Sequence, residues 1–376
     1  MNERLVPGEL SFDPTLPLER ARTLPRRWYF DPEIYAAEVR TIFHDSWQCV
    51  GRAEAVARPG AYLTADVAGE PIAVVRDQQG VLRAFYNVCR HRAAKVLLEP
   101  QGCVGKLRCR YHGWTYDLEG RLRGTPEFDG VCEFTKEDNG LVPVAVAQWG
   151  PFVFVHLGQA PGTLTDYLAP LPQRTATLAW PRFVRRCQYE IACNWKVYVD
   201  NYLDGGYHVN TVHPALAGVL DYAQYRTETF AYCSVQSSPT VAGDPSDPTA
   251  AVRSGTAYYW WIFPNFMINL YAGIMDTNLV LPLGPDRCQV IFDFYFTDTE
   301  GEAAQARIEQ SIAVAHQVQL EDESVCLDVQ RGLHSQSYDT GRFSVKREAG
   351  GYHFHQLVGR RVGALWPGLL SQRHRD

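Results

Sequence analysis

The chain has 376 residues, of which 46% are hydrophobic and 21% charged, and its formal net charge is −6. This length and composition are ordinary for a soluble globular protein with two domains, and the acidic balance argues against nucleic acid as a partner. The sequence has no run of roughly 18 apolar residues that would span a membrane, and residues 1–27 lack the apolar core of a secretory signal, which predicts a cytoplasmic location.

The predicted elements divide the chain into four parts. Residues 1–45 form an N-terminal arm that ends in a helix near residues 32–45. In residues 46–160, short β-type runs alternate with turn signals and predict a small antiparallel β domain. Residues 161–182 are rich in proline and form the predicted linker. Residues 183–376 combine strands with a long helix from about Glu302 to Leu333, so the fold class is α+β.

Ten cysteines are scattered along the chain. This distribution favours reduced thiols in a cytosolic compartment over a disulfide framework. Eight of them are expected to be structural and buried, as small hydrophobic side chains are. The other two belong to a metal-binding pattern in the β domain.

That pattern consists of two short pairs, Cys89-x-His91 and Cys109-x-x-His112, separated by the 17 residues from Arg92 to Arg108. Two thiolates and two imidazoles are the ligands of a Rieske [2Fe–2S] cluster, which moves single electrons. A structural zinc site with two cysteines and two histidines is the alternative. The neighbouring aromatic and donor residues suit the tuning of a cluster and favour it over zinc; these residues are Arg90, Arg92, Gly113, Trp114 and Tyr116.

A second constellation lies in the segment from residue 194 to residue 214, which contains Asp204, His208 and His213. Non-heme Fe(II) oxygenases hold their metal with two histidines and one carboxylate. The two histidines are five residues apart, so a π-type turn or a helix end is needed to bring both to one metal. Asp204 and His208 are four apart and share a face of a helix. Two surface histidines are the alternative, which the neighbouring cluster motif disfavours.

The third iron ligand has to be a carboxylate from elsewhere, and the long helix near residues 302–333 offers one. Its apolar stripe is interrupted by Asp322, where an unpaired buried charge would be costly and a cation would offset that cost. Glu321 and Glu323 point to more polar faces and are the fallback ligands. The stripe consists of Ile308, Ile312, Ala315, Val318, Asp322, Val325, Val329 and Leu333.

An aromatic run in the second domain bears on the substrate. Aromatic faces attract quaternary ammonium groups, and strand alternation places Tyr259, Trp261 and Phe263 opposite Tyr258 and Trp260. An ordinary sheet core is an equally good interpretation of any single ring. The run therefore indicates a methylated ammonium substrate without assigning the residues of a binding cage.

Most of the chain, from about Trp28 to Leu365, resembles the α subunits of Rieske non-heme iron oxygenases, and within them the choline monooxygenase branch. The segments that carry the resemblance are CNWKVYVDNYLDGGYHV, FPNFMINLY, MDTNLVLPLGPDRCQVIFDF and EDESVCLDVQRGLHSQSYDTGRFS. The resemblance implies an N-terminal Rieske domain, residues 46–160, followed by a helix-grip, START-like catalytic domain, residues 183–376. It also implies a homotrimeric ring in which the cluster of one subunit serves the iron of its neighbour.

The resemblance further implies roles for individual residues. Cys89, His91, Cys109 and His112 would hold the cluster, and His208, His213 and Asp322 the mononuclear iron. An acid in the family bridges the two centres across the subunit boundary, and many relatives carry it three residues before the first iron histidine. That position is Gly205 here, so Asp204 is the expected bridge and Asp200 the second choice.

The expected activity is hydroxylation of choline to betaine aldehyde hydrate with O₂ and with electrons from NAD(P)H, delivered by a separate reductase or ferredoxin. Demethylation of a betaine or carnitine-like compound, or hydroxylation or demethylation of an aromatic acid, is the alternative reaction. A zinc-stapled ligand-binding protein without turnover is the alternative of a different class.

Overall fold

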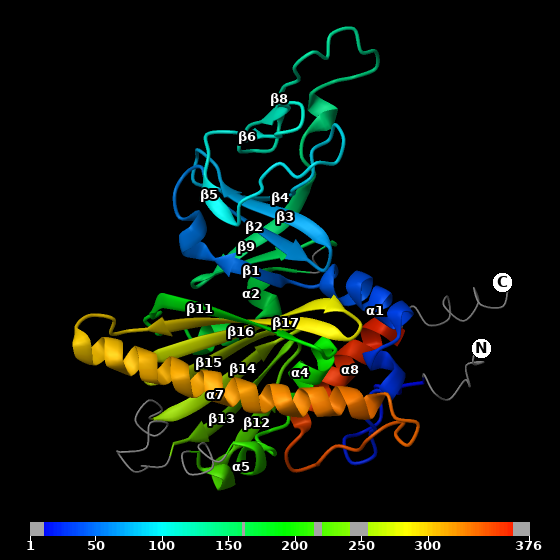
Figure 1. The fold of residues 1–376 in the computed structure, drawn as a ribbon, viewed down its shortest axis with the longest axis vertical. Coiled ribbons are helices and arrows are strands. Elements are labelled where there is room, and N and C mark those ends of the chain that lie inside the picture. The colour runs from blue at the N-terminus through cyan, green and yellow to red at the C-terminus, as the bar shows by residue number, and fades with distance from the viewer. Residues whose placement is uncertain (1–10, 160–161, 214–219, 241–254, 364–376) are drawn as a thin grey trace, which may run out of the picture. The chain divides into compact units, whose positions relative to one another are not determined.

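The computed structural model describes residues 11–159, 162–213, 220–240 and 255–363. Residues 1–10 of the predicted arm, residue 161 of the predicted linker and residues 364–376 of the predicted second domain lie outside these ranges. The chain forms two compact units: residues 43–167 form one, and residues 1–42 together with 168–376 form the other (Figure 1). The predicted domain boundaries remain a prediction.

The unit of residues 43–167 is built from antiparallel strands. A seven-stranded sheet has the order β1-β10-β9-β4-β3-β2-β5, and a small sheet has the order β6-β7-β8. The strands are β1 (Gln48–Arg52), β2 (Ala61–Val67), β3 (Glu70–Arg76), β4 (Leu82–Tyr86), β5 (Gln101–Cys103), β6 (Leu107–Arg108), β7 (Thr115–Tyr116), β8 (Leu122–Gly124), β9 (Pro143–Trp149) and β10 (Phe152–His156). Its short helices are η4 (Ala53–Val56), η5 (Glu137–Asn139) and α2 (Leu164–Tyr167).

The β2–β3 hairpin shows how local sequence sets this unit's register. Val67 pairs with Glu70 across a two-residue turn, in which Ala68 and Gly69 both have positive φ. Two positive φ values are the signature of the turn that matches the twist of paired strands. Ile72 and Val74 of β3 then fall on one buried face and pack into an apolar core.

The other unit is a seven-stranded antiparallel sheet with long helices. The strand order is β11-β17-β16-β15-β14-β13-β12, and the long helix α7 runs across the sheet in Figure 1. The strands are β11 (Arg182–Ile191), β12 (Arg226–Thr229), β13 (Cys233–Pro239), β14 (Thr256–Ile262), β15 (Phe266–Tyr271), β16 (Ile274–Gly284) and β17 (Arg287–Phe296). A further short helix, η3 (Val39–Phe43), spans the point in the chain where one unit ends and the other begins. The other helices are η2 (Arg26–Tyr29), α1 (Pro32–Glu38), α3 (Leu171–Arg174), α4 (Trp195–Tyr202), α5 (Val209–Val212), η6 (Tyr222–Gln224), α7 (Glu302–Leu333) and α8 (Ala349–Gly363).

This architecture confirms the predicted fold class: an antiparallel β domain precedes an α+β domain with an antiparallel sheet and a long C-terminal helix. Helix α7 occupies the predicted range from Glu302 to Leu333. A Pro–Asn turn joins β14 to β15, and a Gly–Pro turn joins β16 to β17. No helix among the described residues is both long and apolar enough to cross a membrane.

Two detailed predictions were wrong. Of the eight cysteines expected to be buried, Cys103 and Cys132 are exposed and Cys187 is half-buried; Cys103 lies in β5, where all three residues face solvent. The apolar stripe of α7 does not continue to Val329, whose side chain is exposed. A helical turn holds 3.6 residues, so the buried face drifts along a long helix. In the C-terminal half of α7 this face is formed by Gln319, Cys326, Gln330 and Leu333.

Two candidate metal centres and a cavity

The four predicted cluster ligands lie on two loops of the β unit. Cys89 and His91 follow β4, and Cys109 and His112 lie between β6 and β7. Each cysteine backbone closes a tight turn: Ala93 N donates to Cys89 O at 3.0 Å, and Gly113 N donates to Cys109 O at 3.1 Å. These turns bring the imidazole rings of His91 and His112 to a centroid distance of 4.5 Å.

The surroundings of these side chains fit a cluster with two thiolates and two imidazoles. Both thiols are buried, and the Nδ1 atom of His91 is buried without a hydrogen-bond partner in the described part of the chain. Burial, followed by His112 and Arg92, lowers the pKa of His91 and keeps the ring neutral, as a metal ligand must be. Burial raises the pKa of Cys109, so a thiolate there needs the positive charge that iron would supply.

Two aromatic residues shield this centre, as the sequence predicted for Trp114 and Tyr116. The Trp114 ring stacks on His91 at a centroid distance of 4.9 Å and an angle of 7°. The Tyr116 hydroxyl lies 3.4 Å from Cys89 Sγ and accepts a hydrogen bond from the backbone N–H of Arg90 at 3.0 Å. Burial raises the pKa of Tyr116, so its hydroxyl stays protonated and available to the sulfur. Hydrogen bonds to cluster sulfurs tune the reduction potential.

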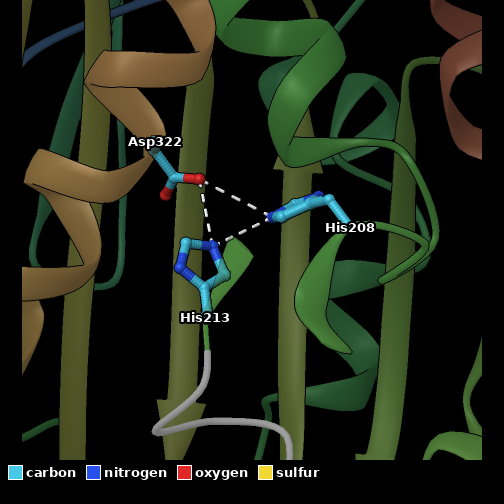
Figure 2. A group of neighbouring side chains, drawn as sticks. All are labelled: His208, His213 and Asp322. Carbon is cyan, nitrogen blue, oxygen red and sulfur yellow. Dashed lines mark hydrogen bonds and ion pairs between the residues drawn. The ribbon is translucent and has the colours of Figure 1, made fainter. Parts of the chain in front are cut away.

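The three predicted iron ligands converge in the other unit (Figure 2). His208 Nε2 lies 3.1 Å from His213 Nε2, and Asp322 Oδ1 lies 3.1 Å from His213 Nε2 and 3.6 Å from His208 Nε2. Ligands about 2.1 Å from a metal and at right angles to one another are roughly 3 Å apart. The triangle of two nitrogens and one oxygen therefore fits one face of a six-coordinate metal.

Local backbone structure explains how residues five apart reach one metal. Helix α5 is a single turn, Val209–Val212, with His208 immediately before it and His213 immediately after it. This is the helix-end arrangement that the spacing requires. Asp204 and His208 do not share a regular helix, because α4 ends at Tyr202 and Gly205 and Gly206 both adopt positive φ. The turn nonetheless brings the Asp204 carboxylate to the backbone N–H and ring Nδ1 of His208.

Both imidazoles are oriented by an acid on the side away from the metal position. Asp204 contacts His208 Nδ1, and Glu321 Oε2 lies 2.7 Å from His213 Nδ1. Partners of this kind fix which ring nitrogen faces a metal. Sequence reasoning treated Glu321 only as a fallback ligand and missed this role, since nothing in the helix pattern reveals where His213 lies.

Asp322 is also held in place. Asn201 of α4 donates to Asp322 Oδ1 at 2.7 Å. Burial lowers the pKa of His213, but hydrogen bonds and charge interactions with Asp322 and Glu321 outweigh it, so the net pKa is raised. The acids around His213 thus create a site of negative charge, which a divalent cation would neutralise.

The two predicted bridge residues lie in different surroundings. Asp204 contacts His208 directly, whereas Asp200 accepts a hydrogen bond from the Tyr29 hydroxyl at 2.8 Å and lies 2.7 Å from His355 Nε2. His355 Nδ1 accepts from Leu24 N at 2.9 Å, so Nε2 carries the ring proton and donates to Asp200. Within the described ranges, Asp200 makes no hydrogen bond or ion pair with a candidate iron ligand.

A cavity of about 110 Å³ opens beside the candidate iron ligands. One side is formed by His208, His213 and Asp322, and the sheet supplies aromatic and polar walls. Tyr259 of the predicted aromatic run lines the cavity, as does Tyr271 of β15; Trp261 is fully buried and packs against Phe354 of α8 instead. The remaining lining includes Tyr198, Tyr202, Tyr225, Gln236, Asn269, Asp276, Asn278 and Phe292.

Comparisons with known proteins agree with this reading of the fold and the two centres. Residues 46–135 match the family described as Rieske [2Fe-2S] domain, and residues 179–364 match the catalytic domain of the ring hydroxylating alpha subunit. The chain belongs to the Rieske non-heme iron oxygenases, as an α subunit that carries a [2Fe–2S] cluster and a mononuclear iron. This membership excludes the zinc-stapled binding protein.

Individual relatives cover nearly the whole chain. A chloroplastic choline monooxygenase of Arabidopsis thaliana is 40% identical over 361 residues, which are 92% of this chain and 84% of the relative. A carnitine monooxygenase oxygenase subunit of Acinetobacter pittii is 29% identical and covers 94% of this chain and 95% of its own. The crystal structure of the quaternary ammonium Rieske monooxygenase CntA with L-carnitine has a TM-score of 0.79 and 30% identity, covering 92% of this chain and 99% of that chain.

Proposed function

We propose that this protein hydroxylates choline at its alcohol carbon and forms betaine aldehyde hydrate. The observation that carries the proposal is the aromatic-walled cavity directly beside His208, His213 and Asp322. Tyr225 and Tyr259 lie parallel with centroids 6.5 Å apart, and Tyr271 meets Tyr259 edge to face at 5.9 Å. Aromatic faces in such an arrangement attract a quaternary ammonium group. The identity of 40% to a choline monooxygenase supports the same substrate.

The residues of the chain would bind and position, while the metals supply the redox chemistry. We assign His208, His213 and Asp322 as ligands of the mononuclear iron, and Cys89, His91, Cys109 and His112 as ligands of the cluster. When bound, the cluster supplies single electrons and the iron supplies the site of O₂ activation. Burial raises the pKa of Tyr198, Tyr202 and Tyr225 well above the usual range, so the cavity walls present neutral hydroxyl donors.

A substrate panel tests this proposal. Purified protein with a separate reductase, NADH and O₂ is given choline, glycine betaine, carnitine and benzoate, and oxygen uptake is scored together with the product. We expect betaine aldehyde hydrate from choline, with oxygen uptake matched to product. Formaldehyde from a methylated amine would identify a demethylase instead, and turnover of an aromatic acid alone would refute the ammonium substrate class.

We further propose that the chain works as a homotrimeric ring and receives electrons from a separate reductase or ferredoxin in the cytoplasm. A structural relative, a quaternary ammonium Rieske monooxygenase, is described as using inter-subunit electron transfer. In this chain, the cluster candidates and the iron candidates lie in different compact units. Ten free cysteines support a cytoplasmic location, because the cytosol keeps thiols reduced.

Asp204 is the residue we propose as the bridge between the centres. Its carboxylate already orients His208, whereas Asp200 is engaged with Tyr29 and His355. We expect Asp204→Asn to have no turnover even when excess ferrous iron fills the iron site, while the electron-spin signal of the reduced cluster stays unchanged. Asp200→Asn is the matched variant, and a complete loss of turnover in that variant alone would move the bridge to Asp200.

A further inference from the structure

A carboxylate on the sheet wall of the cavity has no role in the two metal centres. Asp276 of β16 lines the same cavity as the candidate iron ligands, and only 7% of its surface is exposed to solvent. It pairs in register with Asn269 of β15, which in turn pairs with Tyr259 of β14. Side chains paired directly across a sheet lie on the same face, so the acid, the amide and an aromatic ring form one row along the cavity wall.

Hydrogen bonds fix this carboxylate in place. Asn269 Nδ2 donates to Asp276 Oδ2 at 2.6 Å and to Asn278 Oδ1 at 3.1 Å, while Asn269 Oδ1 accepts from the Tyr202 hydroxyl at 2.7 Å. A carboxylate can only accept hydrogen bonds, so the Asn269 amide is held with its nitrogen towards the acid and its oxygen towards the Tyr202 hydroxyl. The acid is therefore a preorganised part of the cavity wall.

Such a wall suits the chemistry of a quaternary ammonium group. Four alkyl substituents leave this cation without an N–H donor, so it is bound through its charge and through contact with apolar or aromatic surface. A buried carboxylate attracts a cation much more strongly than an exposed one does, because the surroundings screen the charge less. Tyr259 of β14 and Tyr271 of β15 supply aromatic surface in the same cavity.

We propose that Asp276 is the counter-ion of the ammonium head group and that it selects cations without a carboxylate of their own. This inference rests on the proposed function. A compound such as glycine betaine carries a carboxylate close to its ammonium nitrogen, and that carboxylate would lie near Asp276, where like charges repel. Choline carries a hydroxyl instead, and the neutral end can point towards the candidate iron ligands on the other side of the cavity.

The test separates charge from shape. The alcohol 3,3-dimethylbutan-1-ol has the shape of choline with carbon in place of nitrogen, and it is uncharged. Binding of both compounds to the iron- and cluster-loaded protein is measured by calorimetry under anaerobic conditions. We expect the unmodified protein to bind choline at least about tenfold more tightly than the alcohol, and Asp276→Asn to bind the two almost equally. Asp286→Asn, which removes a charge from an exposed turn, should keep the preference.

Turnover gives a second readout. In Asp276→Asn, the KM for choline should rise at least about tenfold while kcat changes much less, because the group acts on binding. If the variant does not fold, the affinities of the two compounds for the unmodified protein still test the inference, because equal affinities would overturn it. Oxidation of choline with an unchanged preference in Asp276→Asn would overturn the counter-ion alone. Failure of the unmodified protein to oxidise choline would overturn the proposed function.

Discussion

At the scale of single residues, the candidate iron site depends on acids that do not face the metal position. Glu321 lies 2.7 Å from His213 Nδ1 and also accepts a hydrogen bond from Gln317 at 2.9 Å. The sequence led to Asp322 because a carboxylate interrupts an apolar stripe. It could not lead to the role of Glu321, because the contact of Glu321 with His213 depends on the position of a single-turn helix more than one hundred residues earlier in the chain.

Replacing Glu321 should weaken iron binding without removing a ligand. We expect Glu321→Gln to lower the affinity for ferrous iron roughly 10- to 100-fold, since outer partners of ligating histidines have effects of this size. The measurement is titration of the iron-free protein with ferrous iron. Glu323→Gln, which removes the same charge two residues further along α7, serves as the control and should leave the affinity unchanged. Equal effects of both variants would reduce the role of Glu321 to general charge.

Gly205 follows Asp204 in a turn that has no room for a side chain. Gly205 has φ +71°, and a Cβ atom there would lie 2.0 Å from the carbonyl oxygen of Arg347. No side chain fits at that distance. An acid at position 205 would therefore not fit this backbone, and the left-handed turn of Gly205 and Gly206 instead brings the Asp204 carboxylate to His208.

Substitution of Gly205 should consequently lower the free energy of unfolding by more than backbone strain alone would. We expect Gly205→Ala to lower the free energy of unfolding by at least about 2 kcal/mol, combining a positive φ with a clash against backbone. Gly80→Ala provides the comparison, because Gly80 has φ +80° with nothing within 4 Å of its Cβ position, and it should cost only about 1 kcal/mol. Urea unfolding measures both, and equal losses would rule out the clash.

At the scale of elements, helices α1 and α4 are joined by a fully buried ion pair. Glu38 at the end of α1 lies 2.6 Å from Lys196 Nζ and accepts from the Trp195 indole at 2.9 Å. All three side chains are buried in the interior. The residues are 158 positions apart, and no local pattern in the sequence reveals such a pair.

Breaking this pair should be strongly destabilising. We expect Lys196→Met to lower the free energy of unfolding by about 3–5 kcal/mol, because it leaves the Glu38 carboxylate buried without its counter-ion. Glu38→Gln combined with Lys196→Met should lose less than the sum of the two single variants, as a double-mutant cycle reports. Additive losses would show that the two groups do not act as a pair.

The stability of the Lys196→Met variant should depend on pH in a defined direction. Burial already raises the pKa of Glu38 while Lys196 opposes it, so removing the lysine raises the pKa further. The folded protein then holds a proton that the unfolded chain has lost, and stability falls as pH rises above the ordinary glutamate pKa. The loss in Lys196→Met should therefore be smaller at pH 5 than at pH 8 in denaturant titrations. A loss independent of pH would point to packing instead of charge.

Helix α7 shows what pattern reasoning reaches at this scale. Its bounds and its inward carboxylate were predictable, since amphipathic periodicity and a following turn mark a long helix. The buried Gln319 and Gln330 were not, because their burial depends on distant partners. Gln319 accepts from the Tyr198 hydroxyl at 2.6 Å, and Gln330 accepts from the backbone N–H of Asn194 at 2.9 Å.

At the scale of the whole molecule, the order of the two domains followed from the sequence. The candidate cluster ligands and the two candidate iron histidines came from short local motifs, and Asp322 came from the periodicity of a distant helix. The position of the N-terminal segment did not. Residues 1–42 belong to the compact unit that carries the candidate iron site, where Leu24 N donates to His355 and the Tyr29 hydroxyl donates to Asp200. Contacts across more than 150 positions leave no trace in local periodicity.

The proposed transfer of electrons between copies of the chain makes a quantitative prediction. Cys109→Ser removes a proposed cluster ligand and His208→Ala removes a proposed iron ligand, so each variant alone should be inactive. We consider a closed ring in which every contact is of the same head-to-tail kind. When the two variants assemble at random in equal amounts, an intact cluster faces an intact iron site at about one contact in four, because each partner is the required variant in half of the cases. The two variants, co-expressed in equal amounts and purified without selecting for mixed rings, should therefore recover roughly a quarter of the choline turnover per chain. A mixture of Cys89→Ser with Cys109→Ser should recover none, because every cluster is then damaged. If the first mixture is equally inactive, each cluster serves only the iron of its own chain.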